Sequence, residues 1–218
     1  MGFLDWFKSN PQAAPSVDAQ GMQRWVVLDV ETSGLDPSEA QLLAVAAVAV
    51  QVDWAKRKLW VCPGDSIDIG IRPATIVSDK SNILIHGIGQ QRQQSGRELG
   101  DALAQVTQFI GSSPLLAFHA WFDKIMIARH LAIAGQAPLA NPWIDIEKLC
   151  VALYPKSRAE SLDDWMDELG ITCATRHEAI ADTFAECEVL QRLWPQLARD
   201  AHNWNELKAI EQVGRRLR

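Results

Sequence analysis

The first half of the chain alternates long apolar runs with short turn-forming segments. Residues 25–30 are mostly β-forming and have no helical period, which predicts a buried strand. A Val/Ala-rich run over residues 42–52 predicts a second strand, and residues 58–72 predict a third. Because the connections between them are short and contain turn residues, we expect an antiparallel meander.

Helical spacing of apolar residues begins later in the chain. Leu99, Leu103, Val106 and Ile110 lie three to four residues apart, which predicts a helix over residues 97–110. The Gln- and Gly-rich residues before it predict a loop over 89–96. Further along, the pattern predicts a strand over 115–118, a helix over 122–134 and a fifth strand over 143–146.

A Ser or Thr followed three residues later by an acid is typical of a helix N-terminus. This pattern occurs at Ser161 with Asp164 and at Thr175 with Glu178, and the second is expected to begin a long helix over 178–201. Three antiparallel strands followed by alternating helices and strands predict an α/β fold, with one five-stranded mixed sheet flanked by helices.

The two ends of the chain differ from this pattern. Residues 1–22 combine a short apolar helical face with a Pro-containing linker, so we expect an N-terminal tail that packs loosely on the domain or docks a partner. Residues 203–218 end in several arginines and are expected to be a basic C-terminal tail. The catalytic or binding domain is therefore expected to span residues 23–202.

Composition excludes several classes of protein. With 218 residues, of which 48% are hydrophobic, the chain has the size of one domain with a real core. Its longest apolar run, about residues 41–52, is too short for a membrane span, which needs about 20 residues. The net charge of −6 argues against a protein that binds a long nucleic acid by electrostatic attraction alone. It does not argue against a protein that binds a short end of a nucleic acid through metal ions.

The cysteines and the start of the chain bear on localisation. The four cysteines include no Cys-x-x-Cys pair, which predicts free thiols and a cytoplasmic location. The first residues carry an acid early and lack a sustained apolar stretch, so no secretory signal peptide is expected.

Acidic residues recur at the ends of the predicted elements. Asp29 and Glu31 lie two apart on a strand, so both side chains leave the same face. Asp123 follows the strand at 115–118, and Asp182 lies in an apolar part of the long helix, five residues after His177. Each also has a simpler explanation. Asp29 and Glu31 could be solvated at the end of the strand, and Asp123 could be a first-turn acid favoured by the helix dipole. His177 could be a first-turn histidine hydrogen-bonded to nearby backbone.

Together these residues supply four carboxylates and one imidazole. Oxygen ligands alone suit Mg²⁺ or Mn²⁺ better than zinc. Two such ions about 3.5–4 Å apart can clamp the attacking and leaving oxygens of a phosphodiester. A histidine can accept a proton from the attacking water near neutral pH.

In their order and spacing these motifs resemble the DEDDh branch of the DnaQ-like 3′-to-5′ exonucleases, which includes the proofreading epsilon subunit of bacterial DNA polymerase III. Residues 29–35 match the first motif, Phe122-Asp123 the second, and residues 177–182 the third. Residues 85–88 resemble a His-Gly-Ile element of the epsilon-like members. The second motif departs from the usual His-Asn-x-x-Phe-Asp, because Phe118 and His119 occupy its first two positions.

The resemblance implies an RNase H-like fold and a metal-dependent 3′-to-5′ exonuclease that releases nucleoside 5′-monophosphates. It implies that Asp29, Glu31, Asp123 and Asp182 hold two Mg²⁺ or Mn²⁺ ions and that His177 is the general base. The residues expected to contact substrate are Thr32, Ser33, Gly34, Leu35, His86 and His119.

The substrate and partners stay open at this point. DNA 3′ ends are favoured, RNA ends are the alternative, and a non-catalytic adaptor module is a third reading. The sequence also leaves open a polymerase or repair partner and a homodimer.

Overall fold

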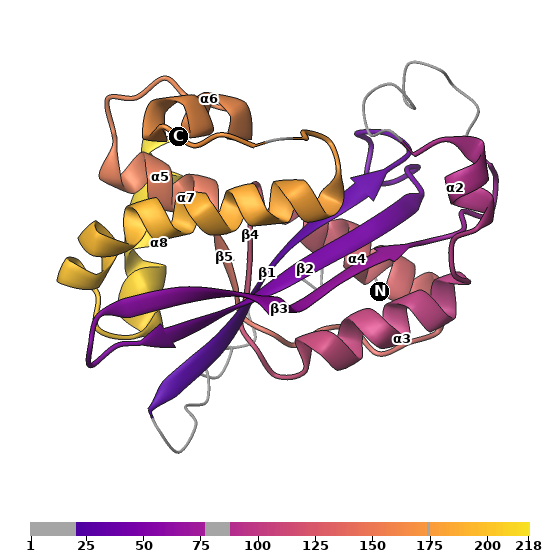
Figure 1. The fold of residues 1–218 in the computed structure, drawn as a ribbon, viewed down its shortest axis with the longest axis horizontal. Coiled ribbons are helices and arrows are strands. Elements are labelled where there is room, and N and C mark those ends of the chain that lie inside the picture. Colours follow the sequence, from indigo (N-terminus) through magenta and orange to yellow (C-terminus); the bar gives the residue numbers. More distant parts are fainter. Residues whose placement is uncertain (1–20, 77–87, 174) are drawn as a thin grey trace.

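The computed structural model describes residues 21–76, 88–173 and 175–218. Its centre is a five-stranded mixed sheet with the strand order β3-β2-β1-β4-β5 (Figure 1). Strands β1 to β3 pair antiparallel, whereas β4 pairs parallel with both β1 and β5. The strands are β1 (Met22–Thr32), β2 (Leu42–Asp53), β3 (Lys58–Gly70), β4 (Leu115–Ala117) and β5 (Trp143–Asp145). The predicted α/β class and antiparallel meander are confirmed.

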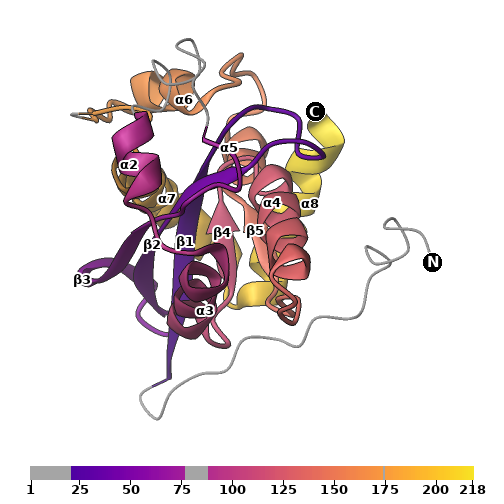
Figure 2. The same cartoon turned by 90° about the vertical axis from the view of Figure 1, so that its right-hand side faces the viewer.

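Helices cover both faces of this sheet (Figures 1 and 2). One apolar core lies between the sheet and α5 to α8, and the other lies between the sheet, α3 and α4. None of the helices in the described part of the chain combines the length and the hydrophobicity that a membrane-spanning helix needs. The helices are α2 (Gln90–Gln94), α3 (Leu99–Ile110), α4 (Trp121–Ile133), α5 (Ile146–Leu153), α6 (Leu162–Leu169), α7 (Ala179–Asp200) and α8 (Trp204–Leu217).

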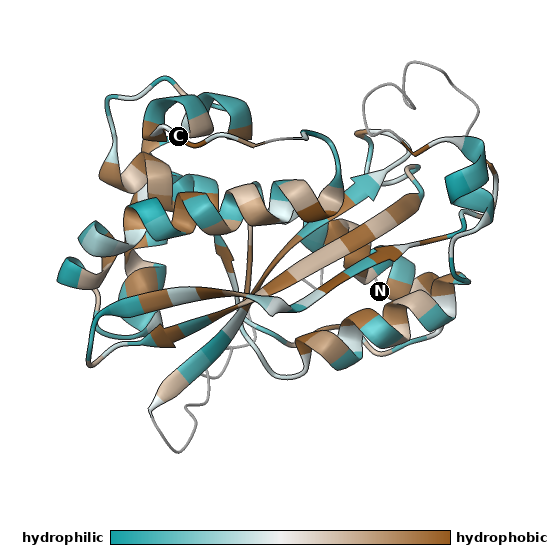
Figure 3. Ribbon diagram, viewed as in Figure 1, coloured by the Kyte–Doolittle hydropathy of each residue, from teal (hydrophilic) through white to brown (hydrophobic). Residues whose placement is uncertain are grey.

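The alternation of strand side chains explains why β1 and β2 are apolar almost throughout. Trp25 and Val27 of β1 lie in the core beneath α7, whereas Val26 and Leu28 lie in the core beneath α3 and α4. A strand covered on both faces has no solvent side on which polar residues could alternate. The hydropathy colouring accordingly shows a predominantly apolar centre of the sheet between helices of mixed polarity (Figure 3).

The capping patterns had different outcomes. Ser161 and Asp164 form a reciprocal capping box at the start of α6, as predicted. The Thr175–Glu178 pattern does not form a cap, because α7 begins at Ala179 and its N-cap Glu178 makes no side-chain capping bond.

Two short helices were not predicted. The expected loop over residues 89–96 contains α2, which has only one buried residue and therefore no apolar period. The fifth strand ends at Asp145, whose side chain accepts a hydrogen bond from the Glu147 N–H and begins α5.

Residues 203–218, expected to be a basic tail, instead contain α8, which packs on α5. Glu211 of α8 is fully buried and pairs with Lys208 and Arg215. Gly214 lies against the backbone of Lys148 so closely that a Cβ there would overlap with its carbonyl. The last helix is thus part of the packed domain rather than an appendage.

Candidate active site

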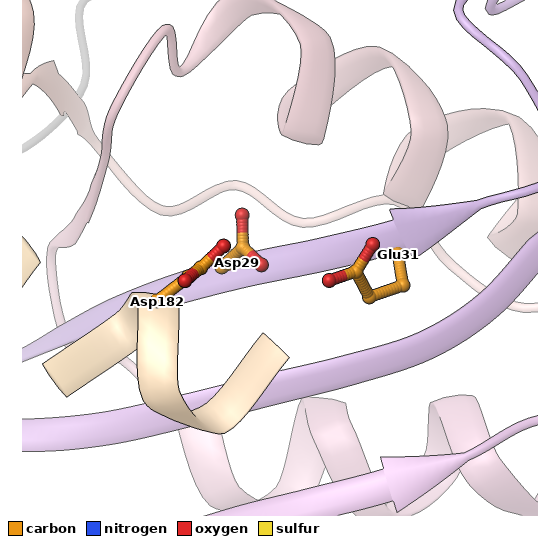
Figure 4. A group of neighbouring side chains, drawn as sticks. All are labelled: Asp29, Glu31 and Asp182. Carbon is orange, nitrogen blue, oxygen red and sulfur yellow. The ribbon is translucent and has the colours of Figure 1, made fainter. Parts of the chain in front are cut away.

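A cleft of about 680 Å³ lies where the C-terminal end of β1 meets the N-terminus of α7. Asp29 and Glu31 reach it from β1 and Asp182 reaches it from α7, and Figure 4 shows the three carboxylates gathered together. One oxygen of each carboxylate lies within 4.8 Å of one oxygen of the other two. The two sequence motifs, more than a hundred residues apart, therefore meet in space.

The period of the strand places the two β1 acids. Trp25 and Val27 face the core beneath α7, and Asp29 and Glu31 continue the same face beyond that core. At this point α7 begins, so its first-turn residue Asp182 comes alongside β1. The strand face changes from apolar to acidic where the packed core ends and the cleft opens.

Asp123 lies in the first turn of α4 and is only 4% exposed. Burial raises its pKa to about 8, and the nearby Asp145 carboxylate acts in the same direction. A hydrogen bond from the backbone of Val30, the residue between the two β1 acids, acts in the opposite direction. Asp123 therefore lies beside Asp29 and Glu31, outside the tight group of three oxygens.

The carboxylates of the cleft repel one another. Burial raises the pKa of Asp29 well above its usual range, and the charges of Asp123, Glu31 and Asp182 raise it further. Burial and the Asp182 carboxylate raise the pKa of Glu31 to about 8. Arg176 is the largest opposing influence on Glu31, and it pairs with Asp182. One guanidinium leaves most of this charge uncompensated, and hard oxygen donors in such a group fit Mg²⁺ or Mn²⁺.

His177 lies on the loop that leads into α7, and it is exposed at the cleft. Its backbone N–H donates to Asp182 at 3.2 Å, which fixes the loop to the acidic group. His177 has a φ of 62° and His119 a φ of 55°. Left-handed backbone costs a non-glycine residue about 1–2 kcal/mol, and such strain often concentrates at functional sites.

The residues expected to contact substrate have different positions. Thr32, Gly34, Leu35 and His119 line the cleft, and Leu35 is 90% exposed at its edge. Ser33 does not line it, because its N–H and its hydroxyl are both hydrogen-bonded to the backbone of Gln41. His86 lies outside the described residues.

Sequence reasoning missed several residues of the cleft. Phe118 and Phe122 add apolar surface, and Arg176 adds a cation that bridges Asp182 and Asp163. Glu186, one turn after Asp182, also lines the cleft. Its spacing of four residues from Asp182 is a signal that could have identified it, since both side chains then share a helix face. Nothing in the sequence identified the partners of Arg176.

The raised pKa values make the stability of the metal-free chain depend on pH. Between the usual carboxyl pKa near 4 and about pH 8, the folded chain holds protons that the unfolded chain has lost. The free energy of unfolding therefore falls as pH rises through this window. Carboxyl groups with lowered pKa values, such as Asp164, stabilise the fold throughout this window and lose that stabilising effect only at pH values below it.

Divalent cations should reverse this loss, since they bind the deprotonated carboxylates. We expect Mg²⁺ near a hundredfold its Kd to raise the Tm by about 5–10 °C at pH 8 and by less at pH 5.5. Thermal unfolding with Mg²⁺ and with EDTA at both pH values checks this. Buried His130, whose pKa is lowered, also makes stability depend on pH. Its effect is the same with Mg²⁺ and with EDTA at a given pH, so it cancels in the Mg²⁺-induced shift of the Tm. Equal Mg²⁺-induced shifts at both pH values would contradict the expectation.

Comparisons of sequence agree with this geometry. The family model described as Exonuclease (RNase_T) matches residues 26–190. A PolC-type DNA polymerase III from Thermotoga maritima is 28% identical over 172 residues, covering 79% of this chain and 12% of the relative. A DNA polymerase III subunit epsilon-like protein from Rhodobacter capsulatus is 28% identical over 175 residues, covering 79% of this chain and 24% of the relative. The chain thus spans only a small part of these relatives.

Comparisons of structure show the same fold. A structure of exonuclease I has a TM-score of 0.65 at 20% identity, and the match covers 80% of this chain and 43% of the exonuclease I chain. A structure of exonuclease X in complex with duplex DNA has a TM-score of 0.61 at 19% identity, and the match covers 79% of this chain and 92% of the exonuclease X chain. The sheet and flanking helices are those of the RNase H-like exonucleases. Since the family model covers most of the chain, the protein belongs to the RNase_T exonuclease family, within the DEDDh superfamily of 3′-to-5′ exonucleases.

Proposed function

We propose that this chain is a metal-dependent 3′-to-5′ exonuclease that hydrolyses the terminal phosphodiester of DNA and releases nucleoside 5′-monophosphates. The observation that carries the proposal is the convergence of Asp29, Glu31 and Asp182 within 4.8 Å in an open cleft. Two Mg²⁺ or Mn²⁺ ions held by these residues and Asp123 would supply the positive charge that the transition state of phosphodiester hydrolysis needs.

The other residues of the cleft have separate roles in the proposed reaction. His177, exposed beside the acids, accepts the proton of the attacking water as the water oxygen bonds to phosphorus. The bond from phosphorus to the 3′ oxygen of the penultimate nucleotide then breaks, and that oxygen takes up a proton. Leu35, Phe118 and Phe122 offer apolar surface for the terminal nucleoside. Arg176 offers a cation for the phosphate.

DNA is favoured over RNA by what the related proteins are. The PolC-type relatives and the epsilon-like relative are named as DNA polymerase III proteins, and exonuclease I structures contain DNA oligonucleotides. In the PolC-type relatives the matched region is joined to a much longer chain, so a polymerase is the partner that the proposal favours.

The test is the degradation of matched DNA and RNA single strands that carry a label at the 5′ end. In Mg²⁺ or Mn²⁺ we expect stepwise shortening from the 3′ end, with DNA degraded faster than RNA, and no shortening in EDTA. A strand with a phosphorothioate at its last linkage is the matched control and should resist. Faster degradation of RNA would replace the DNA assignment with an exoribonuclease. Intact strands of both kinds, with folded protein, would favour a non-catalytic adaptor.

A further inference from the structure

Glu186 is a further carboxylate in the cleft that the motifs do not include. It lies on α7 one turn beyond Asp182, is 2% exposed and lines the same cleft. Its Oε2 atom has no hydrogen-bond partner among the described residues. A buried carboxylate oxygen without a partner is costly, so in the working protein this atom needs a proton, a water or a cation.

The sheet register places Glu186 near Asp29. Strands β1 and β4 pair Val26 with Leu115 and Val27 with Leu116. Phe118 directly follows β4, so it lies toward the same C-terminal end of β1 that carries Asp29. The backbone of Phe118 donates a hydrogen bond to Glu186, which therefore lies over this end of β1.

The charged neighbours of Glu186 separate it from the group of three carboxylates. The negative charges that act most strongly on it are those of Asp29 and Asp123, ahead of Asp182. Neither Glu186 nor Asp123 belongs to the group whose oxygens lie within 4.8 Å. Asp29 thus belongs to the group with Glu31 and Asp182, and its charge also acts on Glu186 outside that group.

Charge balance also favours two cations. Together with Asp123, the cleft contains six carboxylates, and Arg176 pairs with two of them, Asp163 and Asp182. Arg176 and a single divalent cation leave three negative charges uncompensated, whereas Arg176 and two divalent cations leave one, and the side chain of Asp163 is 55% exposed to solvent. A buried acidic group of this size is stable in its charged form only if it is compensated.

We infer that Glu186 is a ligand of the second divalent cation, which it holds together with Asp29 and Asp123, while Glu31 and Asp182 hold the first with Asp29. This rests on the proposed function, because the two-cation site is part of that proposal. The second cation position then depends on a residue outside the three sequence motifs.

The test is a Mn²⁺ titration of the full chain in which EPR measures the free ion. We expect the wild type to bind two ions and Glu186→Gln to bind the second about tenfold or more weakly, with the first unchanged. Glu188→Gln is the matched control, because Glu188 lies on the same helix but is partly exposed and pairs with Arg192. It should bind like the wild type.

Other variants distinguish the outcomes. Unchanged binding of both ions in folded Glu186→Gln would overturn the inference and leave Glu186 as a protonated structural residue. Where Glu186→Gln does not fold, Glu186→Leu, which has no oxygen ligand and suits a buried helix position, is titrated instead, and here too unchanged binding of both ions overturns the inference. Asp29→Asn should weaken the binding of both ions. Normal binding in Asp29→Asn would contradict the proposed function itself, whereas normal binding in the Glu186 variant alone contradicts only this inference.

Discussion

Asp29→Asn is expected to remove nearly all nuclease activity and to leave the fold intact. Asp29 belongs to the group of three carboxylates and the charge of Asp123 also acts on it, so its loss is expected to affect the whole cation site. Asparagine has almost the same shape, and it removes a negative charge that burial and three neighbouring acids already disfavour. A loss of about 10³-fold or more in turnover corresponds to about 4 kcal/mol of transition-state stabilisation.

The measurement is the rate of nucleotide release in excess enzyme with Mg²⁺, beside thermal unfolding in EDTA. The Tm of metal-free Asp29→Asn should equal or exceed that of the wild type, because repulsion is relieved. The rise in Tm that Mg²⁺ causes should be lost. Asp101→Asn, at an exposed position of α3 away from the cleft, is the control and should keep full activity. Normal turnover by folded Asp29→Asn would contradict the site assignment.

The parts of the fold that the sequence predicted are those whose signals are local. The continuous apolar runs of β1 and β2 reflect burial on both faces, and the spacing of Asp29 and Glu31 reflects the period of a strand. The capping box at Ser161 needs only residues within one turn. Such features could be predicted without knowing what packs against them.

The parts that were missed depend on contacts between distant segments. Helix α8 ends in arginines and resembles a solvated tail, yet the buried Glu211 accepts from the Asp145 N–H at 3.3 Å and pairs with Arg215. Thr175 and Glu178 have the same spacing as a capping box, but no side chain caps α7, and Asp182 binds the preceding loop through the His177 N–H. Whether a local pattern is used is decided by the tertiary partner.

His177→Asn is expected to lower turnover by about 10²- to 10⁴-fold, the usual contribution of a general base, without weakening cation binding. Asparagine is chosen because His177 has a left-handed φ of 62°, which asparagine tolerates better than alanine. The His177 N–H that binds Asp182 is kept, since any residue but proline supplies it. The variant therefore removes the proton acceptor and preserves the loop.

Two measurements separate loss of the base from loss of the site. The Mn²⁺ titration of His177→Asn should match that of the wild type, whereas Asp29→Asn should bind both ions more weakly. His202→Asn, an exposed histidine at the far end of α7, is the matched control and should keep full turnover. In His177→Gly, which relieves the left-handed strain and leaves space, added imidazole should restore part of the rate with Mg²⁺. Full turnover by His177→Asn would show that another group accepts the proton. His119, the other histidine that lines the cleft, would then be the first residue to replace.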